Sequence, residues 1–358
     1  LACLIRSKSK SRFNNGGCVW RRIGDRVINK MKKALPDFIL LITAVVGCVV
    51  LLEIVFFLMI RQNPRRIEIS GRQFVDDEVA GYGLPKNSTQ NVIRRFRNGE
   101  TIYHVTYTTD KYGRRMIKQK KDGKHHLIFF GCSFTFGEGL NDDETLPHLL
   151  STLTDYSVYN YGVPGYGPNM MLAKLSDNNF VEEVKETEGA AIYVFINDHV
   201  NRAIGDIYID DRTPYYYLDN DNKLTPRGNF KTSKLLRRGV YNLLRLSNVF
   251  RYLKIPIPPL LMSRDIYLAS RIIQRSAETY RSKFKGNFYI LLYPEAKKNK
   301  HLTDFGNNII EFFKGSGIHI LDYRNLLNHY DENDFYIKND GHPNFLLNKL
   351  IAEQIIKD

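Results

Sequence analysis

Four separate segments of the sequence carry residues that could together perform nucleophilic chemistry. Ser133 lies in GCSFTFGEG, where flanking glycines let the backbone approach a substrate closely. A serine becomes a useful nucleophile when a base takes its proton, and His342 in NDGHP could do so with Asp340 orienting its ring. Gly165 in NYGVPGYG offers an unhindered backbone N–H, and Asn197 in INDH offers a side-chain amide. Because such donors stabilise the oxyanion formed at an ester carbonyl, these residue types predict acyl transfer.

Neighbouring residues could take some of the same roles. Cys132 could itself be the nucleophile, but its side chain should point away from the edge that the serine faces. His199 is the closest rival base because it follows Asn197, although packing near the pocket is the commoner role for such a residue. The pair His125 and His126 could suggest a metal, but no third ligand of suitable spacing accompanies it. We therefore expect neither a metal nor another cofactor.

The candidate residues follow short apolar runs that are bounded by turn residues. The runs are His126–Phe130, Val158–Tyr161, Ala190–Ile196, Phe288–Leu292 and Ile318–Leu321. Helical periodicity lies between them, and this alternation predicts a parallel sheet of about five strands covered on both faces. Ligands of such sheets bind outside the carboxyl ends of the strands. We therefore expect the candidate residues to meet at that edge.

Two amphipathic patterns indicate long helices in the same region. One apolar stripe at helical spacing runs from Ile266 to Phe284, and the other runs from Leu347 to Ile355. Pro343 stands where the first residue of the last helix is expected. These helices would supply the layers that cover the sheet.

The order of the segments resembles that of the SGNH/GDSL hydrolase superfamily, from about residue 124 to the C-terminus. The similarity is strongest over FFGCSFTFGEGLNDDETLP and YNYGVPGYGP, and YTTDKYGRR is similar to a segment that precedes the domain in membrane-anchored members. The resemblance implies a three-layer α/β/α, flavodoxin-like fold. It implies Ser133 as nucleophile and His342 as base with Asp340 as its partner. The oxyanion hole that it implies consists of Ser133 N–H, Gly165 N–H and Asn197.

Two positions depart from the pattern of that family. The family's GDS is GCS here, so Cys132 replaces the acid before the nucleophile. The usual Asp-x-x-His spacing would place the acid at Asn339, whereas Asp340 gives Asp-x-His, which is similar to some relatives that modify exopolysaccharides. Asp331 and Asp334 are the alternative acids.

An apolar segment, residues 38–60, precedes this region. As a helix it would reach roughly 34 Å, enough to cross a hydrocarbon core of about 30 Å. The LMIRQNPRR that follows offers no small-residue cleavage site, so the segment predicts one transmembrane anchor. Glu53 within it is costly in lipid unless it snorkels, is protonated or contacts another membrane protein.

The net charge of +14 is concentrated around this segment. Residues 1–36 carry ten Lys or Arg against one acid, whereas the chain beyond residue 72 has a net charge of only +4. A nucleic-acid groove would need the opposite distribution, so we expect no nucleic-acid partner. The positive-inside rule puts the basic segment 1–37 in the cytoplasm and the rest outside it, in the periplasm if the source is bacterial. The asymmetry nearly vanishes if the chain starts at Met31 instead of Leu1.

The main domain is expected over residues 126–358, with one further segment before it and another inserted into it. Residues 61–125 contain short β-prone runs and predict a small β-rich region after the span. Residues 206–230 are polar and tyrosine-rich, with an NDN turn, and predict an inserted β-hairpin. Its tyrosines could stack on sugar rings, although packing within the hairpin is the commoner role.

These features predict a membrane-anchored serine esterase acting on O-acyl or O-acetyl groups of a carbohydrate or lipid. The same residues would serve an O-acetyltransferase of a cell-envelope glycan, in which a sugar hydroxyl takes the place of water. A third hypothesis is a non-catalytic envelope scaffold or glycan-binding module. The presence of a nucleophile, a base and oxyanion donors together argues against that third hypothesis.

Overall fold

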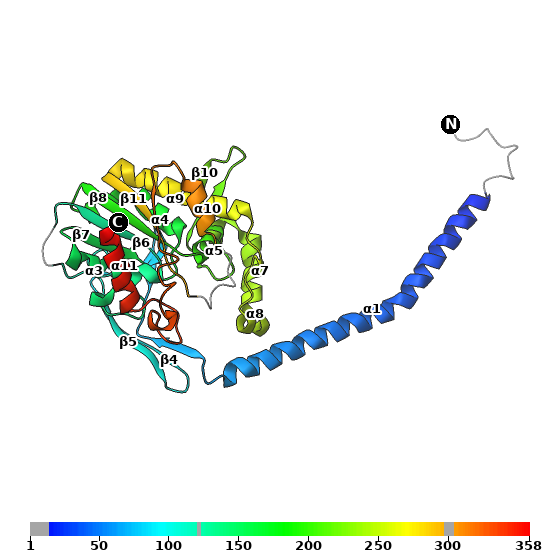
Figure 1. Ribbon diagram of the computed structural model, residues 1–358. Coiled ribbons are helices and arrows are strands. Elements are labelled where there is room, and N and C mark those ends of the chain that lie inside the picture. Colours follow the sequence, from blue (N-terminus) through cyan, green and yellow to red (C-terminus); the bar gives the residue numbers. More distant parts are fainter. Residues whose placement is uncertain (1–13, 120–122, 297–303) are drawn as a thin grey trace. The chain divides into compact units, whose positions relative to one another are not determined.

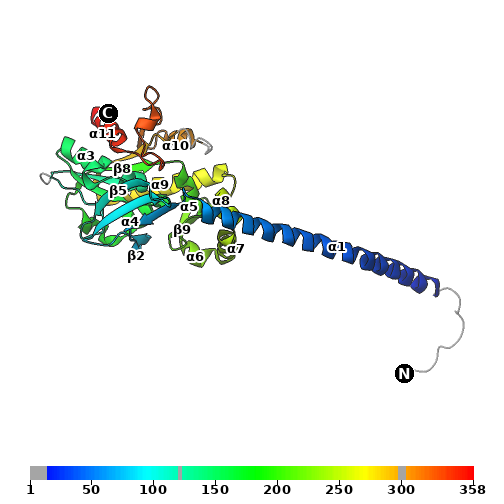
Figure 2. The same ribbon diagram turned by 90° about the horizontal axis from the view of Figure 1, so that it is seen from below.

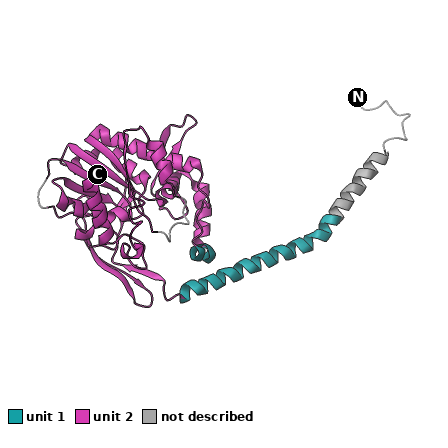
Figure 3. Cartoon of the chain, in the orientation of Figure 1, with its two compact units in different colours: residues 1–62, 247–253 teal, residues 63–246, 254–358 magenta. Residues whose placement is uncertain are grey.

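The computed structural model describes residues 14–119, 123–296 and 304–358. They form two compact units (Figure 3). The first comprises the chain up to Gln62 together with Ser247–Leu253, and the second comprises Asn63–Leu246 and Lys254–Asp358. Residues 1–13 of the predicted basic segment lie outside the described residues.

The first unit contains the predicted span within one long helix, α1 (Asn14–Gln62). From Lys30 to Gln62 this helix is long and apolar enough to cross a membrane, and the protein buries none of its most apolar part. Helical geometry satisfies the backbone polar groups internally, as a bilayer requires. The helix is therefore consistent with a single-pass anchor.

A short helix of the same unit, α8 (Asn248–Leu253), lies against α1. The Glu53 carboxylate accepts hydrogen bonds from Ser247 Oγ and from the Asn248 N–H, the latter at 2.6 Å. The Phe56 and Tyr252 rings are 5.1 Å apart. The carboxylate thus has partners within its own chain, and a contact with another membrane protein stays a prediction.

The second unit is built on a parallel sheet with the strand order β12-β11-β8-β6-β7. Its strands are β6 (His126–Gly131), β7 (Ser157–Gly162), β8 (Glu188–Phe195), β11 (Lys285–Leu292) and β12 (His319–Asp322). Each strand overlaps one predicted apolar run. Taken in chain order this arrangement is 2-1-3-4-5, the flavodoxin-like order that was predicted. In the register of the sheet, Ile128 pairs with Tyr159 on one side and with Ala191 on the other.

Helices cover both faces of this sheet (Figure 1). One face packs on α3 (Leu146–Leu153) and α11 (Phe345–Lys357), and the other on α4 (Pro168–Ser176), α5 (Asp198–Ile204), α9 (Ser263–Lys283) and α10 (Gly306–Phe313). Alternate residues of β6 point to opposite layers, with Leu127 and Phe129 in one core and Ile128 and Phe130 in the other. Figure 2 shows the three layers from below.

The last helix begins two residues later than Pro343, where the sequence predicted its first residue. Asn344 caps α11, because its side-chain oxygen accepts the N–H groups of Leu346 (2.9 Å) and Leu347 (3.2 Å). Pro343 instead forms an isolated bridge with Tyr336. The proline therefore ends the loop that carries His342.

The predicted β-rich region belongs to the same compact unit as the parallel sheet. Its strands are β1 (Ile67–Ser70), β2 (Val75–Asp77), β3 (Gly81–Gly83), β4 (Thr89–Phe96) and β5 (Thr101–Thr108). They form an antiparallel β1-β4-β5 sheet and a β2-β3 pair. A shared core joins Tyr82 and Tyr107 of this region to Phe136, Val163 and Met170 of the sheet domain. Close packing of this kind makes the region part of the frame around the site.

The inserted segment contains an antiparallel hairpin followed by two helices. Its elements are β9 (Pro214–Leu218), β10 (Leu224–Asn229), α6 (Phe230–Ser233) and α7 (Leu235–Leu246). Tyr215 and Tyr216 are buried, and the Tyr215 ring lies 5.0 Å from that of Phe230. Tyr215 packs within the insertion, whereas Tyr216 joins the core between the parallel sheet and its helices, so neither presents its face to a ligand.

Candidate active site

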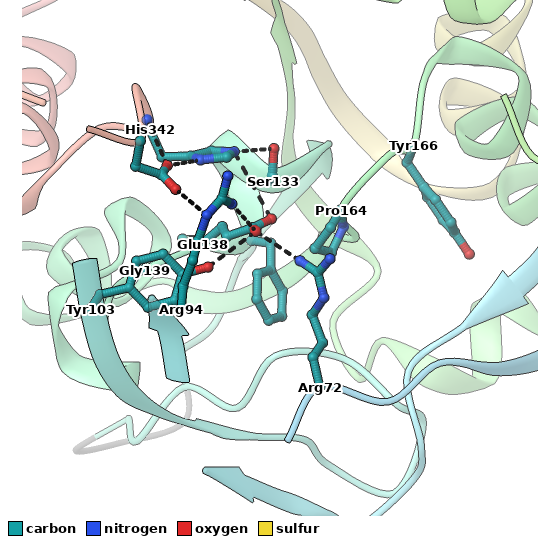
Figure 4. Close-up of polar contacts among 12 residues, drawn as sticks. Arg72, Arg94, Tyr103, Ser133, Glu138, Gly139, Pro164, Tyr166 and His342 are labelled. Atoms are coloured by element: carbon teal, nitrogen blue, oxygen red, sulfur yellow. Dashed lines mark hydrogen bonds and ion pairs between the residues drawn. The ribbon is translucent and has the colours of Figure 1, made fainter. Parts of the chain in front are cut away.

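Ser133, His342 and Asp340 form one hydrogen-bonded line. Ser133 opens α2 (Ser133–Phe136) directly after the first strand of the parallel sheet, and its Oγ lies 2.9 Å from His342 Nε2 (Figure 4). The other ring nitrogen, Nδ1, is hydrogen-bonded to Asp340 Oδ1. The structure therefore brings together the nucleophile, base and acid that the sequence predicted.

A tight turn lets Asp340 reach the ring of His342 across the short Asp-x-His spacing. Asn339 and Gly341 both have left-handed backbones, with φ of 64° and 98°. The Ile337 N–H donates to the carbonyl of His342 at 2.8 Å, which closes the turn. Asp340 Oδ1 accepts both the His342 backbone N–H, at 3.1 Å, and the ring N–H. One carboxylate oxygen thus holds the backbone and the ring of the same histidine.

The two alternative acids point elsewhere. Asp331 accepts the Asn333 N–H at 3.0 Å and caps a short 3-10 turn. Asp334 is exposed, and its backbone carbonyl accepts Asn344 Nδ2 at 2.6 Å. Neither residue lines the pocket that contains Ser133.

Two backbone N–H groups at the site are free to bind an oxyanion. The N–H groups of Ser133 and Gly165 donate no hydrogen bond to any residue that the structure describes, and both residues line the same pocket. Gly165 has a φ of +87°, and a Cβ there would lie 2.4 Å from the Tyr82 hydroxyl. That hydroxyl donates to the carbonyl of Pro164 at 2.9 Å, so a residue of the β-rich region holds this loop. The position accepts only glycine without a shift.

Asn197 does not line the pocket that contains Ser133. Its backbone N–H donates to Glu295 Oε1 at 2.8 Å, and its Oδ1 accepts the Phe305 N–H at 2.9 Å. It lines a separate cavity of about 140 Å³, because its side-chain oxygen is used to hold the chain at the start of α10. These contacts use the backbone N–H and the Oδ1 of Asn197 and not the Nδ2 group that would donate, so its role as an oxyanion donor stays a prediction.

A carboxylate that no sequence pattern indicated, that of Glu138, faces His342. Its side chain is only 5% exposed, and its Oε1 accepts from Arg72 (2.7 Å), Tyr103 Oη (3.2 Å) and Arg94 (3.4 Å). Its Oε2 lies 3.9 Å from His342 Nε2 (Figure 4). The carboxylate is therefore placed to stabilise a positive charge on the His342 ring. The only local signal was a carboxylate within the glycine-rich GEG turn.

Arg94 of β4 completes the site from the β-rich region. Its Nε is 2.9 Å from Asp340 Oδ2, although the two groups are not aligned as a hydrogen bond and neither atom has another partner among the described residues. Burial raises the pKa of Asp340, but the bonds to His342 and the charge of Arg94 outweigh it, so the pKa falls below its ordinary value. Asp340 is therefore ionised at neutral pH.

The pocket around Ser133 has a volume of about 520 Å³, and seven of its fifteen lining residues are charged. Its charged residues are Arg72, Glu138, Asp198, Arg202, Asp206, Asp210 and Arg212. The β-rich region supplies part of the wall with Phe74 and Tyr82, and the segment after α5 supplies Tyr208 and Ile209. Burial, followed by the nearby charge of Asp198, raises the pKa of Asp206 to about 6. Such a lining suits a polar substrate group.

The competing residues are engaged in the core. Cys132 is fully buried and does not line the pocket of Ser133. His199 is also fully buried, with Nδ1 2.7 Å from Tyr193 Oη, and burial lowers the pKa of His199 well below its ordinary value. His126 bonds the Glu186 carbonyl and the Tyr280 hydroxyl. Over the described ranges, no three His, Cys, Asp or Glu side chains are placed to hold a metal ion.

Comparison with known proteins gave matches only among solved structures, since no family model and no curated protein matches the sequence. A member of the lipolytic protein G-D-S-L family from Veillonella parvula is 13% identical, with a TM-score of 0.39, over 65% of this chain and 97% of that chain. An acetylxylan esterase from Geobacillus stearothermophilus is 10% identical, with a TM-score of 0.37, over 67% and 95%. The esterase EstA from Pseudoalteromonas is 11% identical, with a TM-score of 0.36, over 65% and 97%. Because these identities and scores are low, the function of this chain is argued from its own site.

Proposed function

We propose that the chain is a serine-dependent ester hydrolase of the SGNH/GDSL superfamily that forms an acyl-enzyme on Ser133. The observation that carries the proposal is the continuous line from Ser133 Oγ through the His342 ring to Asp340 Oδ1. A nucleophile, a base and an acid in this geometry, with free N–H groups beside them, constitute the machinery of acyl transfer. The order of the motifs along the sequence supports the same family.

In the first half-reaction Ser133 Oγ attacks the ester carbonyl while its proton passes to His342 Nε2. The N–H groups of Ser133 and Gly165 are placed to donate to the oxyanion that develops. The imidazolium is stabilised by Asp340 on one side and by the Glu138 carboxylate, 3.9 Å away, on the other. His342 then protonates the leaving alcohol as the tetrahedral intermediate collapses to the acyl-enzyme.

In the second half-reaction water attacks the acyl carbon. His342 takes a proton from the water, the same N–H groups hold the new oxyanion, and Ser133 recovers its proton as the carboxylic acid leaves. A sugar hydroxyl in place of water would make the protein an O-acetyltransferase without any change in these residues.

The walls of the pocket support a short acyl group on a polar alcohol. Long acyl chains need an apolar channel, whereas seven of the fifteen residues that line this cavity are charged and Phe74, Tyr82 and Tyr208 supply aromatic rings. The candidate span in α1 would hold the enzyme at a membrane. We therefore propose O-acetylated or similarly acylated carbohydrate of the cell envelope as the substrate class, with acylated lipid as the less suited one.

The test is esterase activity of the full chain in detergent or nanodiscs against aryl esters of increasing acyl length. Ser133→Ala should lower kcat by at least about 10³-fold and abolish labelling by a fluorophosphonate serine probe. Ser151→Ala on α3 is the matched control, because its hydroxyl bonds only a local carbonyl. Wild-type protein that is not labelled, while a known serine esterase in the same tube is labelled, would refute catalysis by Ser133.

Hydrolysis and transfer are separated by adding acceptors. An activated acetyl ester is incubated with the enzyme with and without candidate glycans, and both acetate and acetylated glycan are measured. Hydrolysis predicts acetate release that no acceptor changes. Acetylated glycan formed at the expense of acetate would replace the esterase proposal by the transferase.

A further inference from the structure

Helix α7 turns its apolar side toward the outside of its unit. The side chains of one face are exposed to an unusual degree: Leu235 72%, Leu236 86%, Val240 49%, Leu243 70% and Leu246 75%. Their spacing places them on one stripe of the helix. A surface helix of a soluble domain normally buries such a stripe and exposes its charges.

The basic side of the same helix faces the protein. Arg238 Nε and Arg245 Nη1 lie 3.0 and 3.4 Å from Asp211 Oδ2, and Arg237 Nη2 donates to the carbonyl of Ile204 at 2.8 Å. Three arginines thus hold the helix in this orientation by ion pairs and hydrogen bonds. The inverted orientation is built into the fold, because rotating the helix to bury its leucines would break all three contacts.

The chain leaves α7 directly into a segment that packs on the candidate span. Leu246 ends α7, and the next two residues, Ser247 and Asn248, hydrogen-bond Glu53 of α1. Glu53 precedes the end of the apolar segment at Ile60 by seven residues, or roughly 10 Å of helix. Interfacial helices bury their apolar faces about 5–10 Å into the boundary between headgroups and acyl chains.

We propose that the apolar stripe of α7 is a membrane-docking surface, which lies in the interface of the bilayer that α1 crosses. The stripe needs an apolar environment, and the peptide bond between residues 246 and 247 brings the end of α7 to a segment that contacts the span itself. No residue that the structure describes covers the stripe. The exposed Leu260 (79%) and Met262 (71%), in the connection that follows α8, extend the apolar surface available to lipid.

Docking of α7 would also orient the site. The arginines of α7 hold Ile204 and Asp211, which bracket the segment that supplies Tyr208, Ile209 and Asp210 to the pocket. A lipid surface under α7 therefore sets which way this wall faces relative to the membrane, and so which envelope molecules can reach Ser133. The docking itself does not depend on the proposed chemistry.

The test places a polarity-sensitive label on α7 in the full chain. Cys3, Cys18 and Cys48 are replaced by serine, while the buried Cys132 stays. The fluorophore NBD is attached at Leu243→Cys in the middle of the stripe and at the exposed Asn242→Cys at its edge. A third label is attached at the exposed Lys349→Cys on α11. The protein is reconstituted in nanodiscs of phosphatidylcholine and phosphatidylglycerol.

Spin-labelled acyl chains should quench the label at position 243 at least about threefold more than those at 242 and 349, and aqueous iodide should show the reverse order. Equal lipid quenching at 242 and 243 would overturn the proposal. Shielding of position 243 from iodide without lipid quenching would also overturn it, since a second copy or another protein would then cover the stripe.

A second variant tests whether the leucines of the stripe, and not a disturbance of the helix by the label, cause the lipid quenching. Leu236→Gln with Leu243→Gln, labelled at Val240→Cys, should keep the wild-type melting temperature in detergent and lose at least about half of the lipid quenching. Unchanged quenching in a folded double variant would show that the stripe is not what enters the interface.

Discussion

Arg94 Nε lies 2.9 Å from Asp340 Oδ2, while the other oxygen of that carboxylate holds the ring of His342. The arginine comes from β4, in the β-rich region that precedes the parallel sheet. A carboxylate held between an arginine and the proposed base has its charge and orientation set from both sides. The β-rich region therefore positions the proposed acid and base, in addition to lining the pocket with Phe74 and Tyr82.

Replacing Arg94 by Gln should lower kcat/KM by about tenfold, which corresponds to about 1.4 kcal/mol. Because the charge of Arg94 lowers the pKa of Asp340, its loss should raise that pKa and move the acid limb of the pH–rate profile to higher pH. The Arg94→Lys variant should restore part of kcat/KM and part of the wild-type acid limb, because lysine returns the positive charge but not the several N–H donors of the guanidinium. Arg95→Gln is the control, since Arg95 is 53% exposed and pairs with Glu68. A lower rate without any movement of the acid limb would point to a purely structural role.

Asp340→Asn should reduce kcat by about 10²–10⁴-fold, because the amide cannot hold the imidazole in the required tautomer or stabilise its charge. Asp331→Asn and Asp334→Asn should leave kcat within about twofold of wild type, since their contacts are local caps and an exposed loop. Steady-state rates on one aryl ester compare the three variants. An active Asp340→Asn together with an inactive Asp331→Asn or Asp334→Asn would reassign the acid.

Glu138→Gln should lower kcat by about tenfold and also destabilise the fold. One oxygen of its carboxylate accepts from Arg72, Arg94 and Tyr103. Removing the charge therefore takes the ion pair from Arg72 and leaves Arg94 with Asp340 alone. The loss of unfolding free energy should be about 1–3 kcal/mol by urea titration. Glu353→Gln, exposed on α11, is the matched control. Wild-type stability together with a wild-type rate in this variant would show that Glu138 contributes to neither the fold nor the reaction.

Asp206→Asn should become progressively more stable than wild type as the pH rises from about 4 to about 6. The pKa of Asp206 is about 6 in the folded protein and has a reference value of 3.8, so in this window the unfolded chain loses the proton first and wild-type stability falls. The difference should reach about 2–3 kcal/mol and level off above that window. The N–H groups of Tyr208 and Ile209 keep an acceptor in the asparagine oxygen. Urea titrations at several pH values measure this difference in unfolding free energy, and the exposed Asp155→Asn is the control. A difference that does not change with pH would contradict the raised pKa of Asp206.

Arg115→Met should cost about 3–5 kcal/mol of unfolding free energy. Arg115 is 1% exposed and binds Asp142 (2.6 Å) and the carbonyls of Leu140 (2.7 Å) and Phe136 (3.3 Å), so it holds the turn that follows Ser133. Methionine fills the space but leaves these acceptors buried without a donor. The denaturation midpoint of Lys111→Met, an exposed neighbour, should stay near that of wild type. Equal midpoints for the two variants would contradict the structural role of Arg115.

The sequence alone determined the kinds of residue at the site and the order of the elements that carry them. Ser133, His342 and Asp340 were predictable because each follows a strand or precedes a helix whose period is readable locally, and all parallel strands end at the same edge. The span of α1 was predictable for a similar reason, since length and composition decide whether a helix can cross a bilayer.

Only the tertiary structure decided which side chains meet around those residues. Arg94 and Glu138 reach His342 and Asp340 because the β-rich region packs on the sheet domain, and no local pattern encodes contacts between segments so far apart in the chain. The contact between the Oδ1 of Asn197 and the Phe305 N–H likewise joins segments far apart in the chain, and no local pattern predicts it. Periodicity shows that α7 is amphipathic but not which side faces out. The ion pairs of Arg238 and Arg245 with Asp211 decide the orientation of the helix. They hold its basic side against the protein, and the leucines therefore face outward.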